Sequence, residues 1–383
     1  MTIFYLSALL LVVHAAVLVR WTRGWRMATS PIPSPNRGMG APSFTVVIPA
    51  RNEAHTLPSL LDDLAAQSPV LPFSVVVIDD GSEDGTANAA QNHPLARDAR
   101  LRVVKSDGAG KKSALLTGLQ NVTTPWAVTL DADVRLGQGW AESWKRALSH
   151  SHRDVTCVAG PVVLLTRDET SPSLFARLQA LDFAAQMGWS AGQLARKEAG
   201  SASGANLAVR PETYPDTRGL SASGDDTLVV QALQSRGHTV QWLSDGAARV
   251  WAPGASSAHE WVSQRLRWAG KTKHYPWAAK RTAAWMGLMA ATQGMLVAEA
   301  AMARGGVSWA WAAGWWGGVT ALNVMYARPV AQWFGVKAGV VDWVVLGLTQ
   351  PLQVPVLLLA KAGVLRPLGI ASRPTWKGRT CNP

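Results

Sequence analysis

The sequence predicts an α/β domain built on a parallel sheet, flanked by membrane-associated segments at both ends of the chain. Between residues 43 and 275, short runs of β-branched residues alternate with stretches of helical periodicity. This alternation is typical of a parallel sheet covered by helices on both faces. Outside that region the chain contains long apolar runs that carry almost no charge. We therefore expect one α/β domain over residues 43–275, between an anchor and a set of apolar helices.

Five runs are expected to form the strands of this sheet. They are residues 44–50, 73–80, 101–106, 126–133 and 155–165. Ligands of such sheets bind beyond the carboxyl ends of the strands, where the loops converge. Polar side chains lie at the ends of the first, second and fourth runs or directly after them, and they are Arg51, Asn52, Glu53, Asp79, Asp80, Asp131 and Asp133. The sequence thus predicts a polar site at one edge of the sheet.

The composition favours contact with lipid. Hydrophobic residues make up 48% of the 383 residues, and 19 of the residues are tryptophan, which is more apolar than an average soluble protein. The net charge of +12 suits anionic phospholipids or a phosphate-bearing substrate. It would also suit nucleic acid, but no recognised nucleic-acid motif accompanies it, and we expect no such partner. Cys157 and Cys381 are too far apart in sequence to indicate a disulfide framework or a zinc site.

The N-terminal run is expected to be an uncleaved membrane anchor. Residues 2–19 carry no charge and are about as long as a membrane-spanning helix. Arg20, Arg23 and Arg26 follow this run, whereas a cleaved signal peptide has its positive charge before the apolar run. The positive-inside rule then places the N-terminus outside and the α/β domain in the cytoplasm. We assign residues 1–22 to this anchor.

Residues 282–364 are expected to form the C-terminal membrane segments, with apolar runs at 282–303, 307–326 and 339–360. The basic tail, residues 365–383, should be cytoplasmic, so that one of the three runs does not cross. The run at 282–303 contains Gln293 and Glu299, which are costly in lipid, and is the expected exception. The sequence thus predicts a multi-pass protein of the cell (inner) membrane.

The acidic residues at the strand ends either support the local backbone or bind a metal ion. Residues 79–86, DDGSEDGT, are typical of a turn that begins a helix. A calcium loop that begins at Asp80 is disfavoured, because its twelfth position is Gln91 and not Glu. Asp131 and Asp133 form an Asp-x-Asp pair after a buried strand. Such a pair can hold Mg²⁺ or Mn²⁺ together with substrate phosphates.

Three further features are ambiguous when each is taken alone. Lys111 begins a helix, where a cation is disfavoured unless an anion is bound nearby, although a solvated lysine is also consistent. Asp225 and Asp226 introduce a helix, either as capping residues or with one of them as a general base. Gln264, Arg267 and Trp268 share one helical face, which is also typical of an amphipathic interfacial helix.

Taken in order, the motifs VIPARNE, VVIDDGS, GKKSAL, DAD, SGAN, GDD and QRLRW resemble those of a membrane-bound family 2 glycosyltransferase. The resemblance runs from Val46 to Trp268. It includes the Q-x-x-R-W element that is shared with ceramide glucosyltransferases and with cellulose and hyaluronan synthases. It implies a GT-A fold, a nucleotide-diphosphate sugar as donor, with UDP as the expected nucleotide, and inversion at the anomeric carbon.

The resemblance also implies roles for individual residues. Pro49, Arg51, Glu53, Asp80, Lys111 and Asp131 should border the nucleotide sugar. Asp131 and Asp133 match the metal motif, with Asp133 as the more direct ligand. Asp226 matches the general base, and Gln264, Arg267 and Trp268 match the element that borders the acceptor and the diphosphate. The family commonly has Glu where this chain has Asp225, which leaves only the supporting role of that residue open.

The predicted function is transfer of one sugar, or very few, to a hydroxyl of a membrane lipid by a single displacement. A processive polysaccharide synthase is the alternative within enzymes, although two to four spans are few for a polymer channel. A non-catalytic scaffold that binds nucleotide sugar is the alternative outside enzymes, and the intact DAD and GDD motifs argue against it.

Overall fold

The computed structural model describes residues 2–30, 43–67, 73–149, 151, 154–165, 171–216, 226–270, 274–302, 307–368, 375–376 and 379–380. Its main sheet has seven strands in the order β3-β2-β1-β4-β8-β6-β9. Their bounds are β1 Phe44–Ala50, β2 Phe73–Asp79, β3 Leu101–Lys105, β4 Trp126–Thr129, β6 Val155–Ala159, β8 Leu207–Val209 and β9 Thr239–Trp242. A second sheet has the order β5-β10-β7, with β5 Arg135–Leu136, β7 Val162–Leu164 and β10 Val250–Ala252. The short strands β11 Thr375–Trp376 and β12 Arg379–Thr380 pair with each other.

All five expected strand runs form strands, but the expectation of a wholly parallel sheet is wrong. β8 runs antiparallel to both β4 and β6. The chain enters β8 at the edge where β4 ends, since the Thr129 hydroxyl donates to the carbonyl of Gly204 at 2.9 Å. A strand that starts where its neighbour stops must run in the opposite direction. Three residues are too few to give this strand a pattern in the sequence.

The expected strand at 155–165 is divided between the two sheets. It breaks at Gly160 and Pro161 into β6 and β7. Proline has no N–H to donate to a sheet, and the carbonyl of Pro161 instead accepts from Asn206 at 3.0 Å. The fourth run is also shorter than expected, because β4 ends at Thr129, so Asp131 and Asp133 lie in the following turn.

Helices cover both faces of the main sheet. Those of the α/β domain are α2 Leu57–Ala65, α3 Thr86–Gln91, α4 Pro94–Arg97, α5 Lys111–Gln120, α6 Trp140–Ser149, α7 Leu174–Ala195, α8 Thr227–Ser235 and α9 Ala258–Gly270. Alternate residues of β1 face opposite ways, with Val47 in a cluster with α5 and α7, and Val46 in a cluster with α2 and α6. Gly118 of α5 lies so near β1 that an added Cβ would be 2.6 Å from the Val47 side chain.

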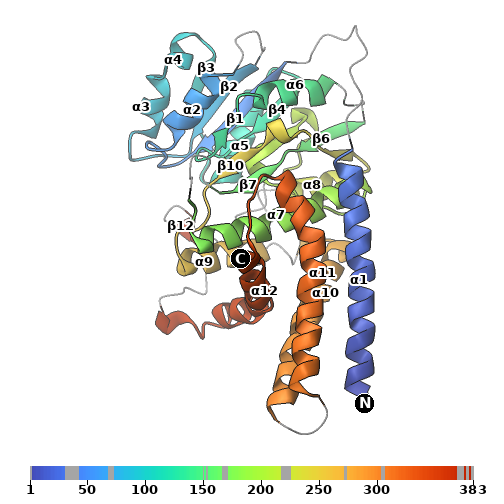
Figure 1. Ribbon diagram of the computed structural model, residues 1–383. Coiled ribbons are helices and arrows are strands. Elements are labelled where there is room, and N and C mark those ends of the chain that lie inside the picture. The colour runs from blue at the N-terminus through green and yellow to red at the C-terminus, as the bar shows by residue number, and fades with distance from the viewer. Residues whose placement is uncertain are drawn as a thin grey trace.

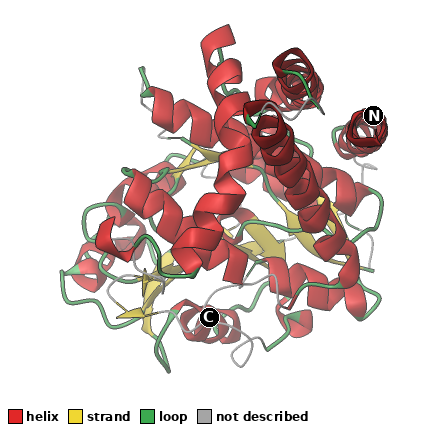
Figure 2. Ribbon diagram, turned by 90° about the horizontal axis from the view of Figure 1, so that it is seen from below, coloured by secondary structure: helices red, strands yellow, loops and turns green. Residues whose placement is uncertain are grey.

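Three long helices project away from the sheet. They are α1 Thr2–Ala28, α10 Trp277–Ala301 and α11 Trp309–Trp333, and they run side by side (Figure 1). Figure 2, the view from below, looks almost along the axis of α1, whose start is marked N. Ile3, Ala300 and Ala312 share one apolar cluster. The start of α1 therefore lies beside the end of α10 and the start of α11.

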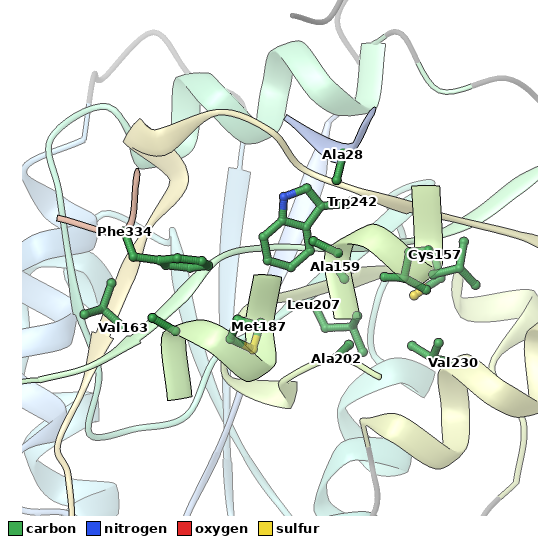
Figure 3. Close-up of a cluster of buried hydrophobic side chains, with 14 of the residues drawn as sticks. Ala28, Cys157, Ala159, Val163, Met187, Ala202, Leu207, Val230, Trp242 and Phe334 are labelled. Carbon is green, nitrogen blue, oxygen red and sulfur yellow. The ribbon is translucent and has the colours of Figure 1, made fainter. Parts of the chain in front are cut away.

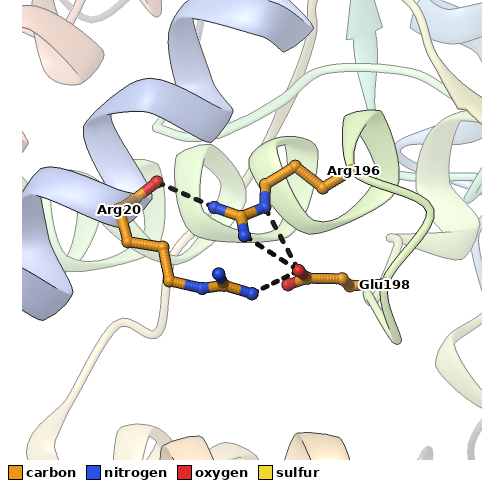
Figure 4. Close-up of polar contacts among 3 residues, drawn as sticks. All are labelled: Arg20, Arg196 and Glu198. Carbon is orange, nitrogen blue, oxygen red and sulfur yellow. Dashed lines mark hydrogen bonds and ion pairs between the residues drawn. The ribbon is translucent and has the colours of Figure 1, made fainter.

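α1 is joined to the α/β domain through α7. Gly24 and Gly192 lie at their crossing, where a Cβ on Gly192 would be 2.9 Å from the Gly24 backbone. Arg20 and Arg196 both bind the Glu198 carboxylate, and Arg196 also donates to the carbonyl of Arg20 at 3.3 Å (Figure 4). This close crossing and the shared carboxylate fix the end of the helix on the domain.

The apolar core continues from the sheet into the helices. Met187 of α7, Leu207 of β8 and Phe334, at the end of α11, belong to one buried cluster (Figure 3). Phe334 stacks on Trp25 of α1 with ring centroids 6.0 Å apart, and packs edge-on against Trp242 of β9. The ends of α1 and α11 are thus part of the domain core, which makes the helices and the domain one packed unit.

Two described helices are long and apolar enough to cross a membrane, namely Ile3–Ala28 and Val340–Lys361. The second is α12. The expected run at 282–303 is not among them, as predicted, but neither is 307–326, which was expected to cross. That run lies in α11, which is rich in Trp, Gly and Ala and also contains Asn323. These residues lower its mean hydropathy.

Both ends of α12 contact the α/β domain. Near its start, Asp342 pairs with Arg177 of α7 at 2.9 Å. Near its end, Ala360 packs against Val262 and Leu266 of α9. Pro351 and Pro355 interrupt the hydrogen bonding of this helix. α12 therefore lies along the underside of the domain, beneath α7 (Figure 1).

Candidate active site

One cavity of about 710 Å³ brings together most of the residues predicted from the sequence. It begins beyond the ends of β1 and β4 and continues between α7, α9, α10, α11 and α12. Ten of the predicted residues line it, namely Pro49, Arg51, Glu53, Lys111, Asp131, Asp133, Asp226, Gln264, Arg267 and Trp268. The structure thus places them on one surface, while the roles assigned to them stay predictions.

Asp80 is the predicted residue that does not line this cavity. Its carboxylate is 3% exposed and accepts two hydrogen bonds from the backbone N–H of Gly110, at 2.8 and 3.0 Å. Gly110 has φ +96°, a conformation that favours glycine. Asp80 therefore fixes the loop that presents Lys111, and its backbone carbonyl accepts from Arg51 at 2.9 Å.

The remaining acidic residues of the turn after β2 serve the backbone. Asp79 accepts from the N–H of Ser82 at 3.0 Å. Asp84 accepts from the N–H groups of Thr86, at the start of α3, and of Ala54. Burial opposes ionisation of Asp84, but these hydrogen bonds together hold its pKa below the ordinary value. Asp84 therefore starts the next helix, as the sequence indicated.

Lys111 lies beside the Asp-x-Asp pair. Its ammonium group is 2.6 Å from the Asp131 carboxylate. The anionic partner expected for this lysine is thus a carboxylate in the structure. A phosphate that enters the cavity would meet the same ammonium group, because Lys111 and Asp131 both line it.

The Asp-x-Asp pair fits a divalent cation that is shared with a bound diphosphate. Within the described ranges, no group of three or more His, Cys, Asp or Glu side chains could hold a metal ion. Mg²⁺ sites of enzymes that bind phosphates commonly use one or two carboxylates and complete the shell with phosphate oxygens and water. Asp131 and Asp133 supply that number of carboxylates on the cavity wall.

Asp226 lies at the start of α8 and faces the same cavity. Its carboxylate accepts from the N–H of Thr227, so it caps the helix as well. Burial, followed by the nearby charge of Asp226, raises the pKa of Tyr275 to about 12, although a hydrogen bond with Thr227 opposes this. Tyr275 therefore stays protonated near neutral pH. Asp225 lies outside the described residues.

Gln264, Arg267 and Trp268 of α9 all line the cavity, whereas Arg265 does not. Arg265 and Asp182 of α7 form an ion pair in which both residues are 7% exposed. The Arg265 guanidinium also lies over the rings of Trp261 and Trp268, at 5.3 and 5.1 Å. This pair holds α9 on α7 and orients the Trp268 ring.

The sequence did not indicate several residues of the cavity wall. They are Asp182, Gln186, Tyr275, Lys280, Asn323 and Gln350. Each lies in or beside a largely apolar helix and belongs to no local motif. The Asn of the SGAN motif, Asn206, is fully buried and does not line the cavity. It accepts from the indoles of Trp140 and Trp144 and donates to two backbone carbonyls, which joins both sheets.

The fold and site define an α/β domain with a polar cavity at the carboxyl edge of its sheet. Residues 45–200 match the family Glycosyl transferase family 2. This part of the chain is therefore similar to the domain of that family. The mannosyltransferase PcManGT from Pyrobaculum calidifontis, solved with GDP-Man and Mn²⁺, is similar in structure, with a TM-score of 0.55 and 20% identity. The similarity covers 91% of this chain and 98% of that one, which shows a GT-A-like fold.

Curated relatives match over a part of their length. An undecaprenyl-phosphate 4-deoxy-4-formamido-L-arabinose transferase of Yersinia enterocolitica is 33% identical over 96 residues, which is 24% of this chain and 29% of that protein. A PGL/p-HBAD biosynthesis glycosyltransferase of Mycobacterium bovis is 30% identical over 126 residues, 33% of this chain and 49% of that protein. The chain thus spans less than half the length of these relatives.

Proposed function

We propose that the protein transfers a sugar from a nucleotide diphosphate, UDP being the expected nucleotide, to a hydroxyl of a membrane lipid, with inversion. One observation carries this proposal. The cavity that contains Asp131, Asp133 and Asp226 is walled at its other end by Met286, Leu346 and other residues of α10, α11 and α12. A polar donor site and an apolar acceptor path therefore share one space.

The proposed reaction is a single displacement at the anomeric carbon. The acceptor hydroxyl attacks this carbon, the bond to the diphosphate oxygen breaks, and the hydroxyl proton passes to the Asp226 carboxylate. Lys111 and Arg267 face the departing diphosphate and stabilise its negative charge. Asp131 and Asp133 would hold Mg²⁺ or Mn²⁺, which supplies further positive charge opposite the leaving group.

The relatives support a lipid acceptor. One is named as an undecaprenyl-phosphate transferase and another as a PGL/p-HBAD biosynthesis glycosyltransferase. For this chain a hydroxyl acceptor is favoured over a phosphate, because the Asp226 carboxylate faces the cavity. A carboxylate repels a phosphate but accepts a proton from a hydroxyl.

Transfer to lipid is tested with purified full-length protein in lipid nanodiscs. We expect labelled sugar, supplied in turn as a panel of nucleotide sugars, to move into the organic phase on solvent extraction, and the Asp226→Asn variant to serve as the blank. Label in an aqueous, high-molecular-weight fraction that polysaccharide hydrolases degrade would favour a processive synthase. Donor binding without any transfer would favour the scaffold.

We further propose that α1, α10 and α11 cross the inner membrane and that α12 lies at its cytoplasmic surface. Composition favours α12 as a span and not α10, in agreement with the sequence-based prediction. The packing of the helix ends supports the opposite assignment, because both Asp342 and Ala360 of α12 contact the cytoplasmic domain. Either assignment leaves the α/β domain and the 365–383 tail in the cytoplasm. The domain bounds remain a prediction from the sequence.

The two ends of α12 are expected to lie on the same side of the membrane. Single cysteines in place of Val340, 80% exposed, and Val364, 58% exposed, should both be labelled by an impermeant thiol reagent in inverted vesicles only. The background carries Cys381→Ser, and Cys157 is buried. Labelling of the two positions from opposite sides would show that α12 crosses.

A further inference from the structure

Four hydrogen-bonded side chains connect the four apolar helices. The indole N–H of Trp285 in α10 donates to Nδ1 of His14 in α1 at 3.2 Å. Nε2 of His14 is 2.9 Å from Oδ1 of Asn323 in α11. Nδ2 of Asn323 donates to Oε1 of Gln350 in α12 at 3.3 Å. Polar side chains are costly among apolar helices unless they are hydrogen-bonded, and here each helix contributes one partner.

The donor and acceptor roles in this series of hydrogen bonds follow from Trp285, its first member. The indole of Trp285 can only donate, so Nδ1 of His14 must accept. A neutral imidazole then carries its proton on Nε2 and donates it to Asn323, which must present its oxygen. The amide nitrogen of Asn323 is left to donate to the oxygen of Gln350. All three bonds therefore donate in one direction, and the amide nitrogen of Gln350 comes last.

Asn323 and Gln350, the last two side chains of this hydrogen-bonded series, line the candidate active-site cavity. Asn323 and Gln350 are on its wall, beside Thr320 and Gly347. α11 and α12 pack closely there, since a Cβ on Gly347 would be 2.3 Å from the Thr320 side chain. Within the described part of the chain, the Gln350 amide nitrogen donates to no other residue. The hydrogen-bonded side chains thus hold the two N–H groups of Gln350 at the cavity, with no acceptor for them among the described residues.

We propose that Gln350 donates a hydrogen bond to an uncharged oxygen of the acceptor lipid, an ester, ether or second hydroxyl, that is distinct from the reacting hydroxyl. This inference rests on the proposed function, since it assumes that a lipid occupies the cavity. The neighbours of Gln350 on the wall, Thr320, Asn323 and Gly347, carry no charge. The cations of the wall belong to other elements, and they are Arg51 after β1, Lys111 of α5, Arg267 of α9 and Lys280 in the first turn of α10. A neutral donor held by neutral side chains suits a neutral oxygen, and a phosphate would bind where the cations are.

The site is tested by binding, so that the result does not depend on transfer. Purified full-length protein in nanodiscs is exposed to four photoreactive probes of equal chain length: hexadecane, hexadecanol, methyl hexadecanoate and hexadecyl phosphate. Wild-type protein should capture the alcohol or the ester in preference to the hydrocarbon. Loss of one neutral hydrogen bond should reduce this preference roughly three- to tenfold in Gln350→Met.

Gln293→Met is the matched control, because Gln293 is a buried amide of α10 that does not line the cavity. It should keep the wild-type preference. Asn323→Leu, which removes the hydrogen bond from Asn323 to Gln350, should weaken the preference without changing Gln350 itself. Equal capture of hydrocarbon and ester by the wild type, an unchanged preference in Gln350→Met, or strongest capture of the phosphate at this position would each overturn the proposal. Intact preference in a protein that glycosylates no lipid would instead overturn the proposed function.

Discussion

Replacing Asp226 by asparagine is expected to lower the rate of sugar transfer roughly 10²- to 10⁴-fold, the usual effect of losing a general base. Donor affinity should change little. The Asp226 side chain caps α8 through the N–H of Thr227, and asparagine is as good a cap as aspartate. The fold is therefore preserved while the proton acceptor is removed. Single-turnover transfer and nucleotide binding, measured on the same preparation, separate the two effects.

The matched control for this variant is Asp245→Asn. Asp245 also caps a short helical segment, through the N–H of Ala247, but it does not line the cavity. This variant should transfer sugar at nearly the wild-type rate. If Asp226→Asn also retained that rate, the base would have to be another group, and Asp225 would be the next carboxylate to replace.

Replacing Asp133 by alanine is expected to abolish the metal-dependent part of nucleotide binding. Asp133 matches the more direct ligand of the metal motif and lines the cavity, so it is the carboxylate on which we expect a divalent cation to depend most. Since no described group of three or more ligand side chains could hold the metal ion, metal and nucleotide should bind together and each weakly alone. Calorimetric titration of nucleotide with and without Mn²⁺ measures this coupling.

Asp107→Ala provides the control for Asp133. Asp107 also follows a strand of the main sheet, β3, but it is not on the cavity wall and accepts instead from Thr117. This variant should keep the wild-type dependence on Mn²⁺. Wild-type protein that binds nucleotide equally well in EDTA would show that donor binding does not use a metal ion.

The sequence predicted much of the site because strand ends obey a general rule. Arg51, Glu53, Asp131 and Asp133 follow buried strands, and such residues meet at one edge of a sheet. The rule says which edge a residue reaches but not where its side chain points. Asp80 shows this limit, because its carboxylate turns to the backbone of Gly110 and away from the cavity.

Other parts of the site leave no local pattern. Arg265 and Arg267 lie two residues apart on α9, and only the position of α7 decides that Arg265 is buried against Asp182 while Arg267 faces the cavity. A lone Asp182 in a helix of 22 residues has no signal of its own. Its importance comes from a partner 83 residues away in the chain.

The sequence by itself determined the strands β1, β2 and β3, the order of the motifs and the class of the domain. These depend on alternation and on strand ends, which are local properties of the chain. Only the tertiary structure decided that β8 runs antiparallel, that α12 lies under the domain, and that the helices are joined through His14 and Asn323. These two residues are 309 positions apart, and their contact depends on how whole helices pack, which no short stretch of sequence encodes.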